Sequence, residues 1–290
     1  MGPAQLRTYR DGVAIMTGGA SGIGRALAEE LGREGAEVVL ADLQVEMAEE
    51  VAAGIRKEGG RAKAVFLDVT DFEAVNRVIQ ETVASSGRLD YLFNNAGIVI
   101  LGEAHFHGID DWNKVIDVNL RGVVHGVQAA YPLMRRQGFG HIVNTASIAG
   151  LLPVAGEPSY VATKHAVVGL SSALRIEAAL AGVRVSVLCP GAVETPIASG
   201  GKFGKMLQPI PEETRKRLWA ELGPIQPAAF AKHALAAIAK NQDIIVLPWR
   251  ARLLWWLYRI CPGIVDFIFR RMFLKYKDEI EQYSASPGRQ

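Results

Sequence analysis

Short apolar runs alternate with longer amphipathic runs along most of this 290-residue chain, and this alternation constrains its fold more than any other feature. Strands that alternate with helices form βαβ units, which build a parallel sheet covered by helices. The apolar runs have few polar interruptions, as expected of strands that are buried on both sides. The sequence therefore predicts an α/β fold with a doubly wound, mostly parallel seven-stranded sheet and helices on both faces.

The expected strands are the apolar runs 13–16, 37–41, 64–67, 91–93, 142–144, 183–188 and 244–247. The expected helices are 23–33, 45–57, 72–85, 111–137, 160–181 and 228–240. Asp71 is placed to act as the N-cap of the third helix. The alternation stops in two regions, 192–211 and everything after Pro248. We therefore predict one catalytic domain over residues 1–248 and a C-terminal extension over residues 249–290.

The composition is that of a globular protein, with 49% hydrophobic and 21% charged residues. The net charge of +2 gives no general attraction to nucleic acid, and no motif suggests such a partner. Two cysteines, Cys189 and Cys261, suggest neither a disulfide framework nor a metal site. The sequence has no apolar leader and no run of the roughly 18 apolar residues that a spanning helix needs, so we predict a cytoplasmic protein.

A glycine-rich turn, Thr17–Gly24, lies between the first predicted strand and the first predicted helix. Glycines let a backbone approach a pyrophosphate, and a helix N-terminus offers free N–H groups and a positive dipole end. The glycine triplet Gly18, Gly22 and Gly24 alone is weak evidence, but its position between a strand and a helix favours a dinucleotide site over a tight turn without a ligand.

Asp42 ends the second predicted strand, about twenty residues after the glycines, where an acid is expected to bind the adenosine ribose. A carboxylate accepts hydrogen bonds from the ribose hydroxyls and repels a 2′-phosphate, so Asp42 favours NAD over NADP. Arg25 follows the turn and favours NADP more weakly, because it could pair with that phosphate. Asp42 could instead be only a helix cap.

Tyr160 and Lys164 are four residues apart in a predicted helix and therefore project from one face. A phenol has a pKa near 10, and a nearby ammonium group stabilises the phenolate. The pair could thus act as an acid–base catalyst at neutral pH. Without other evidence, this spacing is common and has no functional meaning.

Further motifs accompany this pair in the order and spacing of one family, and the chain resembles the short-chain dehydrogenase/reductase family. The matching motifs are the turn 17–24, Asp68-Val69, Asn94-Asn95-Ala96-Gly97, Asn119, Ser147, Tyr160 with Lys164, and Pro190-Gly191 with Thr195. They span most of residues 13–197, and their joint occurrence is highly specific. The resemblance implies a Rossmann-like fold and hydride transfer between a nicotinamide and an alcohol or ketone.

The resemblance also implies roles for four catalytic residues. Tyr160 would exchange a proton with the substrate oxygen, and Ser147 would hydrogen-bond that oxygen. Lys164 would bind the nicotinamide ribose and lower the pKa of Tyr160. Asn119 would hold a water that links Lys164 to solvent. Each of these residues also has an ordinary structural explanation, as a cap, a turn former or a surface charge.

The cofactor contacts implied by the resemblance come from four segments. The turn would contribute Gly18, Ser21, Gly22, Ile23 and Gly24. Asp68 and Val69 would hold the adenine, and Asn95, Ala96 and Gly97 would line the adenosine side. The nicotinamide would pack on Pro190, Gly191, Val193 and Thr195. His105 and His107 follow the fourth strand, and we expect them to be exposed or to border the substrate site.

Residues 198–222 are expected to form a lid over the substrate. Its apolar side chains favour a lipophilic substrate, although they could serve packing alone; they are Phe203, Met206, Leu207, Leu218 and Trp219.

The extension interleaves basic and apolar side chains, and Pro262-Gly263 divides it into two expected helices. The basic residues are Arg250, Arg252, Arg259, Arg270, Arg271, Lys275 and Lys277. Such a pattern is typical of helices that lie in a membrane interface. Peripheral membrane contact through 249–277 and packing against another subunit or the substrate site are both open.

We therefore predict an NAD-dependent oxidoreductase for a lipophilic secondary alcohol, steroid- or lipid-like, with Tyr160 as acid and base. A reductase of 3-oxoacyl thioesters shares the same residues and is the alternative. A membrane-docked, dinucleotide-sensing binding protein is a third hypothesis, which the intact catalytic set argues against. A homo-oligomer, dimer or tetramer, is expected through helices 111–137 and 160–181.

Overall fold

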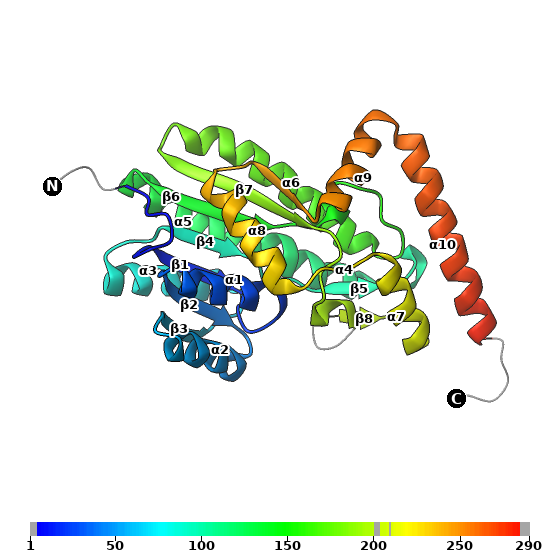
Figure 1. The fold of residues 1–290 in the computed structure, drawn as a ribbon, viewed down its shortest axis with the longest axis horizontal. Helices are drawn as coiled ribbons and strands as arrows, with labels where there is room; N and C mark the ends of the chain where they lie inside the picture. The colour runs from blue at the N-terminus through cyan, green and yellow to red at the C-terminus, as the bar shows by residue number, and fades with distance from the viewer. Residues whose placement is uncertain (1–4, 200–203, 209, 285–290) are drawn as a thin grey trace.

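Seven parallel strands form the centre of the fold, as the apolar runs predict (Figure 1). The computed structural model describes residues 5–199, 204–208 and 210–284. The strands are β1 (Val13–Thr17), β2 (Glu37–Asp42), β3 (Arg61–Phe66), β4 (Tyr91–Asn94), β6 (Gly140–Thr145), β7 (Val183–Pro190) and β9 (Ile244–Leu247). Their order in the sheet is β3-β2-β1-β4-β6-β7-β9, and every pair is parallel. The doubly wound α/β prediction is confirmed.

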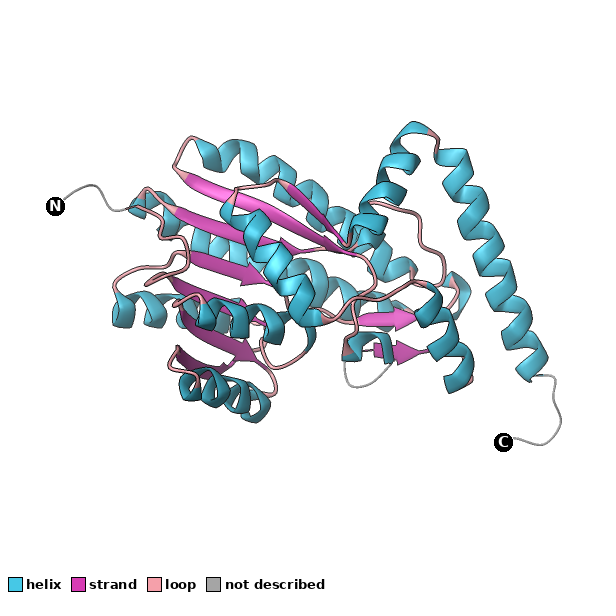
Figure 2. Cartoon of the chain, in the orientation of Figure 1, coloured by secondary structure: helices cyan, strands magenta, loops and turns pink. Residues whose placement is uncertain are grey.

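Helices cover the two faces of this sheet and enclose one apolar core on each side (Figure 2). One core is formed with α1 (Gly22–Arg33), α2 (Val45–Lys57) and α8 (Pro227–Ala239). The other is formed with α3 (Phe72–Ser86), α5 (Gly122–Gln137) and α6 (Pro158–Ala179). The predicted N-cap of α3 is present, since the Asp71 side chain accepts a hydrogen bond from the amide of Ala74.

The chain reverses its winding direction at β1. From β1 it proceeds to β2 and β3 on one side, and it then crosses to β4 on the other side. Ligands of open α/β sheets bind outside the carboxyl ends of the strands at such a point. The fold therefore places the glycine turn and the end of β4 at the expected position of a ligand site.

The long helix predicted over 111–137 is interrupted. Helix α4 (Ile109–Ile116) passes into a π-helical turn (Asp117–Arg121), and α5 follows it. Hydrogen bonds between the turn and the segment after β4 explain the interruption, because the Asn119 side chain bonds the main chain of Ile98 instead of pointing to solvent. Such turns are frequent at functional sites.

Two short segments pair where the sequence suggested only irregular structure. β5 (Val99–Leu101) and β8 (Gly204–Met206) form a parallel two-stranded sheet, and α7 (Glu212–Glu221) follows β8. The pairing connects the expected lid to the chain that leaves β4. Phe203, one of the lid's apolar residues, lies outside the described residues.

The C-terminal extension forms two helices, α9 (Trp249–Ile260) and α10 (Pro262–Ser284). They lie beside the end of the sheet toward which the strands point (Figure 1). Among the described residues, no helix is both long enough and apolar enough to cross a membrane. Residues 285–290 of the predicted extension lie outside the described part of the chain.

Candidate active site

The glycine turn between β1 and α1 is shaped by steric limits that only glycine meets. Gly18 and Gly22 have φ of +66° and +55°, a region that L side chains rarely adopt. A Cβ on Gly24 would lie 2.1 Å from the carbonyl oxygen of Gly18, and one on Gly18 would lie 2.9 Å from Cα of Ala96. The turn therefore needs glycine at these positions to keep its backbone close to β4.

The N-terminus of α1 is free to accept an anion. Ser21 is its N-cap residue but makes no side-chain capping bond, and the first turn, which begins with Gly22, Ile23 and Gly24, contains no acidic residue. A helix N-terminus of this kind presents unpaired N–H groups and the positive end of the helix dipole. The turn thus fits the pyrophosphate of a dinucleotide.

Asp42 is buried at the carboxyl end of β2 and is 6% exposed. One carboxylate oxygen accepts from the amide of Ala20 at 3.0 Å, and the other accepts from the amide of Gln44 at 2.9 Å. Asp42 is not the N-cap residue of α2, which is Gln44, so the alternative that it serves only as a helix cap is not met. The two bonds fix the carboxylate beside the glycine turn, and each oxygen keeps a further lone pair for a ribose hydroxyl.

The segments after β3 and β4 extend the same edge. Asp68 accepts from the amide and the hydroxyl of Thr70, at 2.9 and 2.7 Å. The carbonyl of Val69 contacts the imidazole of His125 at 2.9 Å. The two expected adenine-side residues are therefore fixed by local bonds, and Val69 is buried.

Asn95 connects the end of β4 to the glycine turn. Its side-chain amide donates to the carbonyls of Thr17 and Gly18, at 3.1 and 3.2 Å. The hydroxyl of Thr17 accepts from the amides of Asn95 and Ala96, at 2.9 and 3.1 Å. The sequence placed Thr17 at the start of the glycine turn but gave its hydroxyl group no role, although its position as the last residue of β1 was a usable signal.

The loop after β7 lies opposite the glycine turn. Pro190 ends β7, and the amide of Gly191 donates to the carbonyl of Leu247 at 2.7 Å. Val193 is buried. A Cβ on Gly22 would lie 3.3 Å from the methyl group of Thr195, so the loop and the turn face each other.

Asn119 is fully buried in the π-helical turn and exchanges two hydrogen bonds of 2.8 Å with the main chain of Ile98. Gly97 lies beside it: a Cβ there would be 3.3 Å from the Asn119 carbonyl oxygen and 3.5 Å from Nζ of Lys164. The structure thus brings Asn119 and Lys164 to one point next to the end of β4.

Ser147 follows β6 and faces Tyr160 at the start of α6. Hydrogen bonding by Ser147 lowers the pKa of the Tyr160 phenol, and Oγ of Ser147 also accepts from the amide of Ala149 at 3.1 Å. Lys164 is 2% exposed, and its Nζ donates to the carbonyl of Thr145 at 2.9 Å. This Nζ lies 5.3 Å from the centre of the Tyr160 ring. The four predicted catalytic residues therefore share one site.

The pKa of Tyr160 differs from the sequence-based expectation. Burial raises the pKa of the Tyr160 phenol and the nearby Glu157 raises it further, while the bond from Ser147 lowers it. Burial also lowers the pKa of Lys164 to about 8. The expected net lowering of the tyrosine pKa by Lys164 is therefore not met in the protein alone, because the loss of hydration outweighs the other effects.

Glu157 is an acid of the site that sequence reasoning missed. It precedes Tyr160 by three residues and is the N-cap residue of α6. Burial raises the pKa of its carboxyl group to about 8. The helical spacing to Tyr160 was the signal that could have identified it.

The outer border of the site consists of the loop after β5, helix α7 and helix α10. The amide of Gly102 in that loop donates to the carbonyl of Gly156 at 2.7 Å. A Cβ on Gly156 would lie 4.0 Å from the ring of Phe273, which belongs to α10. Three ion pairs join α10 to this border: Arg217–Glu279, Lys275–Glu221 at 3.1 Å and Lys277–Glu103 at 3.3 Å.

The two histidines of the loop after β5 have different surroundings. His105 is exposed, whereas His107 is half-buried, with Nε2 at 3.1 Å from the carbonyl of Gly102. Among the described residues, neither histidine forms a hydrogen bond with Tyr160. They border the site rather than form its catalytic group.

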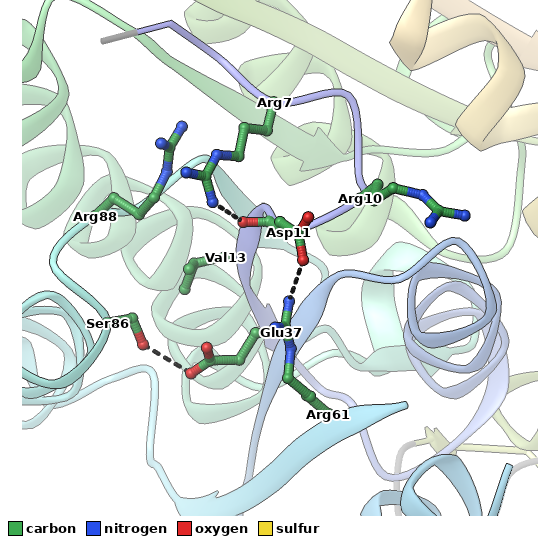
Figure 3. A pocket seen from close by; sticks show the side chains of 8 residues that line it. All are labelled: Arg7, Arg10, Asp11, Val13, Glu37, Arg61, Ser86 and Arg88. Carbon is green, nitrogen blue, oxygen red and sulfur yellow. Dashed lines mark hydrogen bonds and ion pairs between the residues drawn. The ribbon is translucent and has the colours of Figure 1, made fainter. Parts of the chain in front are cut away.

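A hollow of about 600 Å³ lies at the opposite edge of the sheet, near the amino ends of β1, β2 and β3 (Figure 3). Its lining residues are Arg7, Arg10, Asp11, Val13, Glu37, Arg61, Ser86 and Arg88. Several of these groups already bond one another, as Asp11 does with Arg61 at 3.2 Å and Ser86 with Glu37 at 2.7 Å. No predicted site residue lines it.

Comparison with known proteins agrees with this geometry. The family model described as short chain dehydrogenase matches residues 12–202. The 2,5-dichloro-2,5-cyclohexadiene-1,4-diol dehydrogenase of Sphingobium indicum is 44% identical over 187 residues, covering 64% of this chain and 75% of that protein. The cyclohexanol dehydrogenase of an Acinetobacter species is 37% identical over 203 residues, covering 69% of this chain and 80% of that protein.

The fold comparison gives the same result. The crystal structure of a short chain dehydrogenase/reductase from Burkholderia phymatum in complex with NAD has a TM-score of 0.78 and 31% sequence identity. The match covers 89% of this chain and 96% of that one.

Proposed function

The chain belongs to the short-chain dehydrogenase/reductase family of oxidoreductases, and from this premise we propose that it oxidises a secondary alcohol, or reduces the corresponding ketone, with NAD. The observation that carries the proposal is the grouping of Ser147, Tyr160 and Lys164 beside the glycine turn. A bound nicotinamide would supply the acceptor or donor of the hydride.

The side chains of the site bind the substrate oxygen and transfer its proton. Tyr160 takes the proton of the alcohol oxygen in oxidation and returns it in reduction. Ser147 donates a hydrogen bond to the same oxygen and holds it next to the phenol. The pKa of Lys164 is about 8, so its amino group is charged at lower pH. This charge stabilises the Tyr160 phenolate as it forms. Asn119, which lies next to Lys164 beside Gly97, would hold a water that links Lys164 to solvent.

We propose NAD as the preferred dinucleotide because the Asp42 carboxylate is fixed where the ribose hydroxyls would lie. Its negative charge would repel a 2′-phosphate. Replacing Asp42 by Ala should raise kcat/KM with NADP relative to NAD by about tenfold, the effect of roughly one hydrogen bond to a charged group. An unchanged ratio would mean that another residue selects the cofactor.

The proposed substrate class is a lipophilic alcohol that carries its hydroxyl group on a ring or a bulky chain. The outer border of the site supports this class, because Phe273 and the lid residues Met206 and Leu207 are apolar. The names of two relatives, a cyclohexadienediol dehydrogenase and a cyclohexanol dehydrogenase, also point to cyclic alcohols.

The direct test is the absorbance of reduced nicotinamide with NAD and NADP, across secondary alcohols that include cyclic alcohols and steroids. We expect turnover by the wild type and a loss of about 10²–10⁴-fold in kcat for Tyr160→Phe, with NAD binding retained. Clear NAD binding without turnover of any alcohol would contradict the proposal and favour a dinucleotide sensor.

We further propose that the extension contacts an anionic membrane surface. One face of α9 exposes apolar side chains at helical spacing: Trp249, Leu253, Trp256 and Ile260 are 59%, 58%, 51% and 79% exposed. Arg259 lies beside this face, 5.8 Å from the ring centre of Trp256. Basic residues next to an apolar face are suited to anionic lipid headgroups.

This membrane proposal is tested by co-sedimentation of the full chain with vesicles of neutral lipid and of mixed neutral and anionic lipid. Binding should require the anionic lipid and should be lost when Leu253 and Trp256 are both changed to Ser. The matched control is Phe66→Ser, which removes an apolar side chain that is 62% exposed on β3, far along the sheet from α9. A wild-type chain that binds neither vesicle would rule out the proposal.

We also propose that the chain forms at least a dimer through α5 and α6. Ile176 and Leu180, one turn apart at the end of α6, are 77% and 94% exposed. Neighbouring exposed apolar residues that form a continuous patch can mark an interface between subunits. In analytical ultracentrifugation, the wild type should sediment as a dimer or a larger oligomer. The Leu180→Glu variant should sediment as a smaller species.

A further inference from the structure

The hollow at the amino ends of β1, β2 and β3 has the size of a small-molecule site but an unusual lining (Figure 3). Its volume is about 600 Å³, within the range of ligand sites in proteins. Sites for lipophilic ligands are lined mostly by apolar side chains. Here four of the eight lining residues are arginines, and among the described residues that line the hollow only Val13 is apolar. The lining therefore suits a polar, charged ligand rather than a lipophilic alcohol.

The lining carries more positive than negative charge. Its four arginines face two acids, and the buried Asp90 offsets one further charge by pairing with Arg88. Arg61 pairs with Asp11 at 3.2 Å. Within the part of the chain that the structure describes, Arg7 forms no ion pair. Positive charge therefore remains in the hollow, and it favours an anionic ligand.

Arg88 is held in place and still has free donors. Its Nε donates to Oδ2 of Asp90 at 2.7 Å, and its Nη2 donates to Oδ1 of Asp90 at 2.5 Å and to the carbonyl of Gln5 at 2.7 Å. The guanidinium also lies 4.7 Å from the ring centre of Phe139. Its Nη1 donates to no group among the described residues. A guanidinium fixed with N–H groups to spare is suited to a phosphate.

The loop that carries Arg7 has a strained backbone. Tyr9 and Asp11 have φ of +60° and +58°, a region that residues other than glycine rarely adopt. The Tyr9 hydroxyl donates to the carbonyl of Leu235 at 2.6 Å, and the amide of Asp11 donates to the carbonyl of Gly35 at 2.9 Å. These bonds hold the loop so that Nη1 of Arg7 donates to the Asp11 carbonyl at 2.6 Å (Figure 3). Strained residues cluster at binding sites.

An acid and a hydroxyl group lie across the hollow from Arg7 and Arg88 in the view of Figure 3. The Ser86 hydroxyl donates to Oε1 of Glu37 at 2.7 Å. Among the described residues, Oε2 of Glu37 accepts no hydrogen bond. A carboxylate repels a simple anion but accepts hydrogen bonds from hydroxyl groups. The hollow therefore matches a ligand with a phosphate at one end and hydroxyl groups at the other.

We propose that this hollow binds a soluble sugar phosphate, with the phosphate on Arg7 and Arg88 and the sugar hydroxyls on Glu37. The inference does not depend on the proposed function. The hollow lies at the amino ends of the strands, whereas the glycine turn lies at the carboxyl end of β1. A dinucleotide and a sugar phosphate can therefore be bound at the same time.

The experiment is isothermal titration calorimetry of the full chain with ribose 5-phosphate, inorganic phosphate and ribose, in the presence of excess NAD. The NAD occupies the glycine turn, which is the other site expected to bind a phosphate. The wild type should bind ribose 5-phosphate about tenfold more tightly than inorganic phosphate, the effect of roughly one hydrogen bond to a charged group. Ribose alone should give no measurable binding. Added salt should weaken the binding of ribose 5-phosphate.

Three variants test the assigned roles. Arg7→Ala should weaken the binding of ribose 5-phosphate about tenfold, because it removes a charged donor. Glu37→Gln should reduce the difference between ribose 5-phosphate and inorganic phosphate. Asp11→Asn removes a negative charge from the hollow and should tighten binding several-fold, a gain that misfolding cannot produce. The matched control is Arg77→Ala, which removes an exposed arginine of α3 outside the hollow and should change nothing.

Thermal unfolding of each variant checks that it folds. The inference would be overturned if the wild type bound no ribose 5-phosphate, or if Arg7→Ala bound it as tightly as the wild type. Binding that is seen only without NAD would also overturn it, because the phosphate would then lie at the glycine turn. Equal affinity for ribose 5-phosphate and inorganic phosphate would overturn the assignment to a sugar phosphate.

Discussion

The glycine turn and helix α10 both border the active site, but they are held in place by opposite means. The turn is fixed by backbone contacts that leave no room for a Cβ at Gly24 and by side-chain bonds from Asn95. Helix α10 is joined to the border by ion pairs whose side chains are 22% to 54% exposed. Exposed ion pairs contribute between about 0 and 1 kcal/mol each and are screened by salt.

The difference matches what the two regions would bind, the cofactor at the turn and the substrate at the border. A pyrophosphate is the same in every turnover, so a rigid turn suits it. A border that must admit and release a substrate is better served by contacts that break at low cost. Three predictions test this comparison, and they are ordered from the largest expected effect to the smallest.

Replacing Gly24 by Ala should produce the largest change. A Cβ there would lie 2.1 Å from the backbone oxygen of Gly18, so the turn must move. We expect a loss of about 1–3 kcal/mol in the free energy of unfolding, typical of overpacking, and weaker NAD binding. Urea denaturation and NAD titration measure the two effects.

The matched control for this change is Gly54→Ala in α2, where a Cβ would meet no atom within 4 Å. Alanine should stabilise this helix by up to about 1 kcal/mol and leave NAD binding unchanged. Equal effects at Gly24 and Gly54 would show that the turn is not sterically limited.

The charge of Glu157 should affect the pH dependence of the reaction. The Glu157 carboxylate raises the pKa of Tyr160, and an amide at this position cannot ionise. The alkaline rise of kcat/KM for oxidation, which reports formation of the phenolate, should therefore move to lower pH in Glu157→Gln. A shift to higher pH, or a profile that does not move, would contradict the described position of the carboxyl group.

Removing the charges that join α10 to the border should have the smallest effect on stability. For Lys275→Ala combined with Lys277→Ala, we expect a loss of about 1 kcal/mol or less in the free energy of unfolding. The KM of the alcohol should change more than the KM of NAD, and the difference should disappear at high salt. Lys216→Ala is the control, because Lys216 pairs with Glu212 inside α7.

A double variant that loses several kcal/mol, or whose KM for NAD changes most, would mean that α10 belongs to the rigid part of the site.

The alternation of apolar runs was sufficient to predict the parallel sheet and the positions of its strands. It could do so because strands buried on both faces must be apolar along their length. The family resemblance implied that Ser147 and Tyr160 act on the same substrate oxygen, whereas the bonds from Asn95 to the glycine turn were not predicted. The break in the helix at Asn119 was not predicted, because it depends on hydrogen bonds to Ile98, 21 residues earlier.

The sequence by itself determined the fold class, the edge of the sheet that carries the site and the identity of the groups gathered there. The fold class follows from local periodicity, and the site groups follow from the family resemblance that the joint motifs carry. The tertiary structure decided that α10 closes the outer border and that the charge of Glu157 acts on the pKa of Tyr160. It also decided that burial raises the pKa of Tyr160, which Lys164 was expected to lower. These properties depend on which distant segments exclude water from a group, and no local pattern in the chain records that.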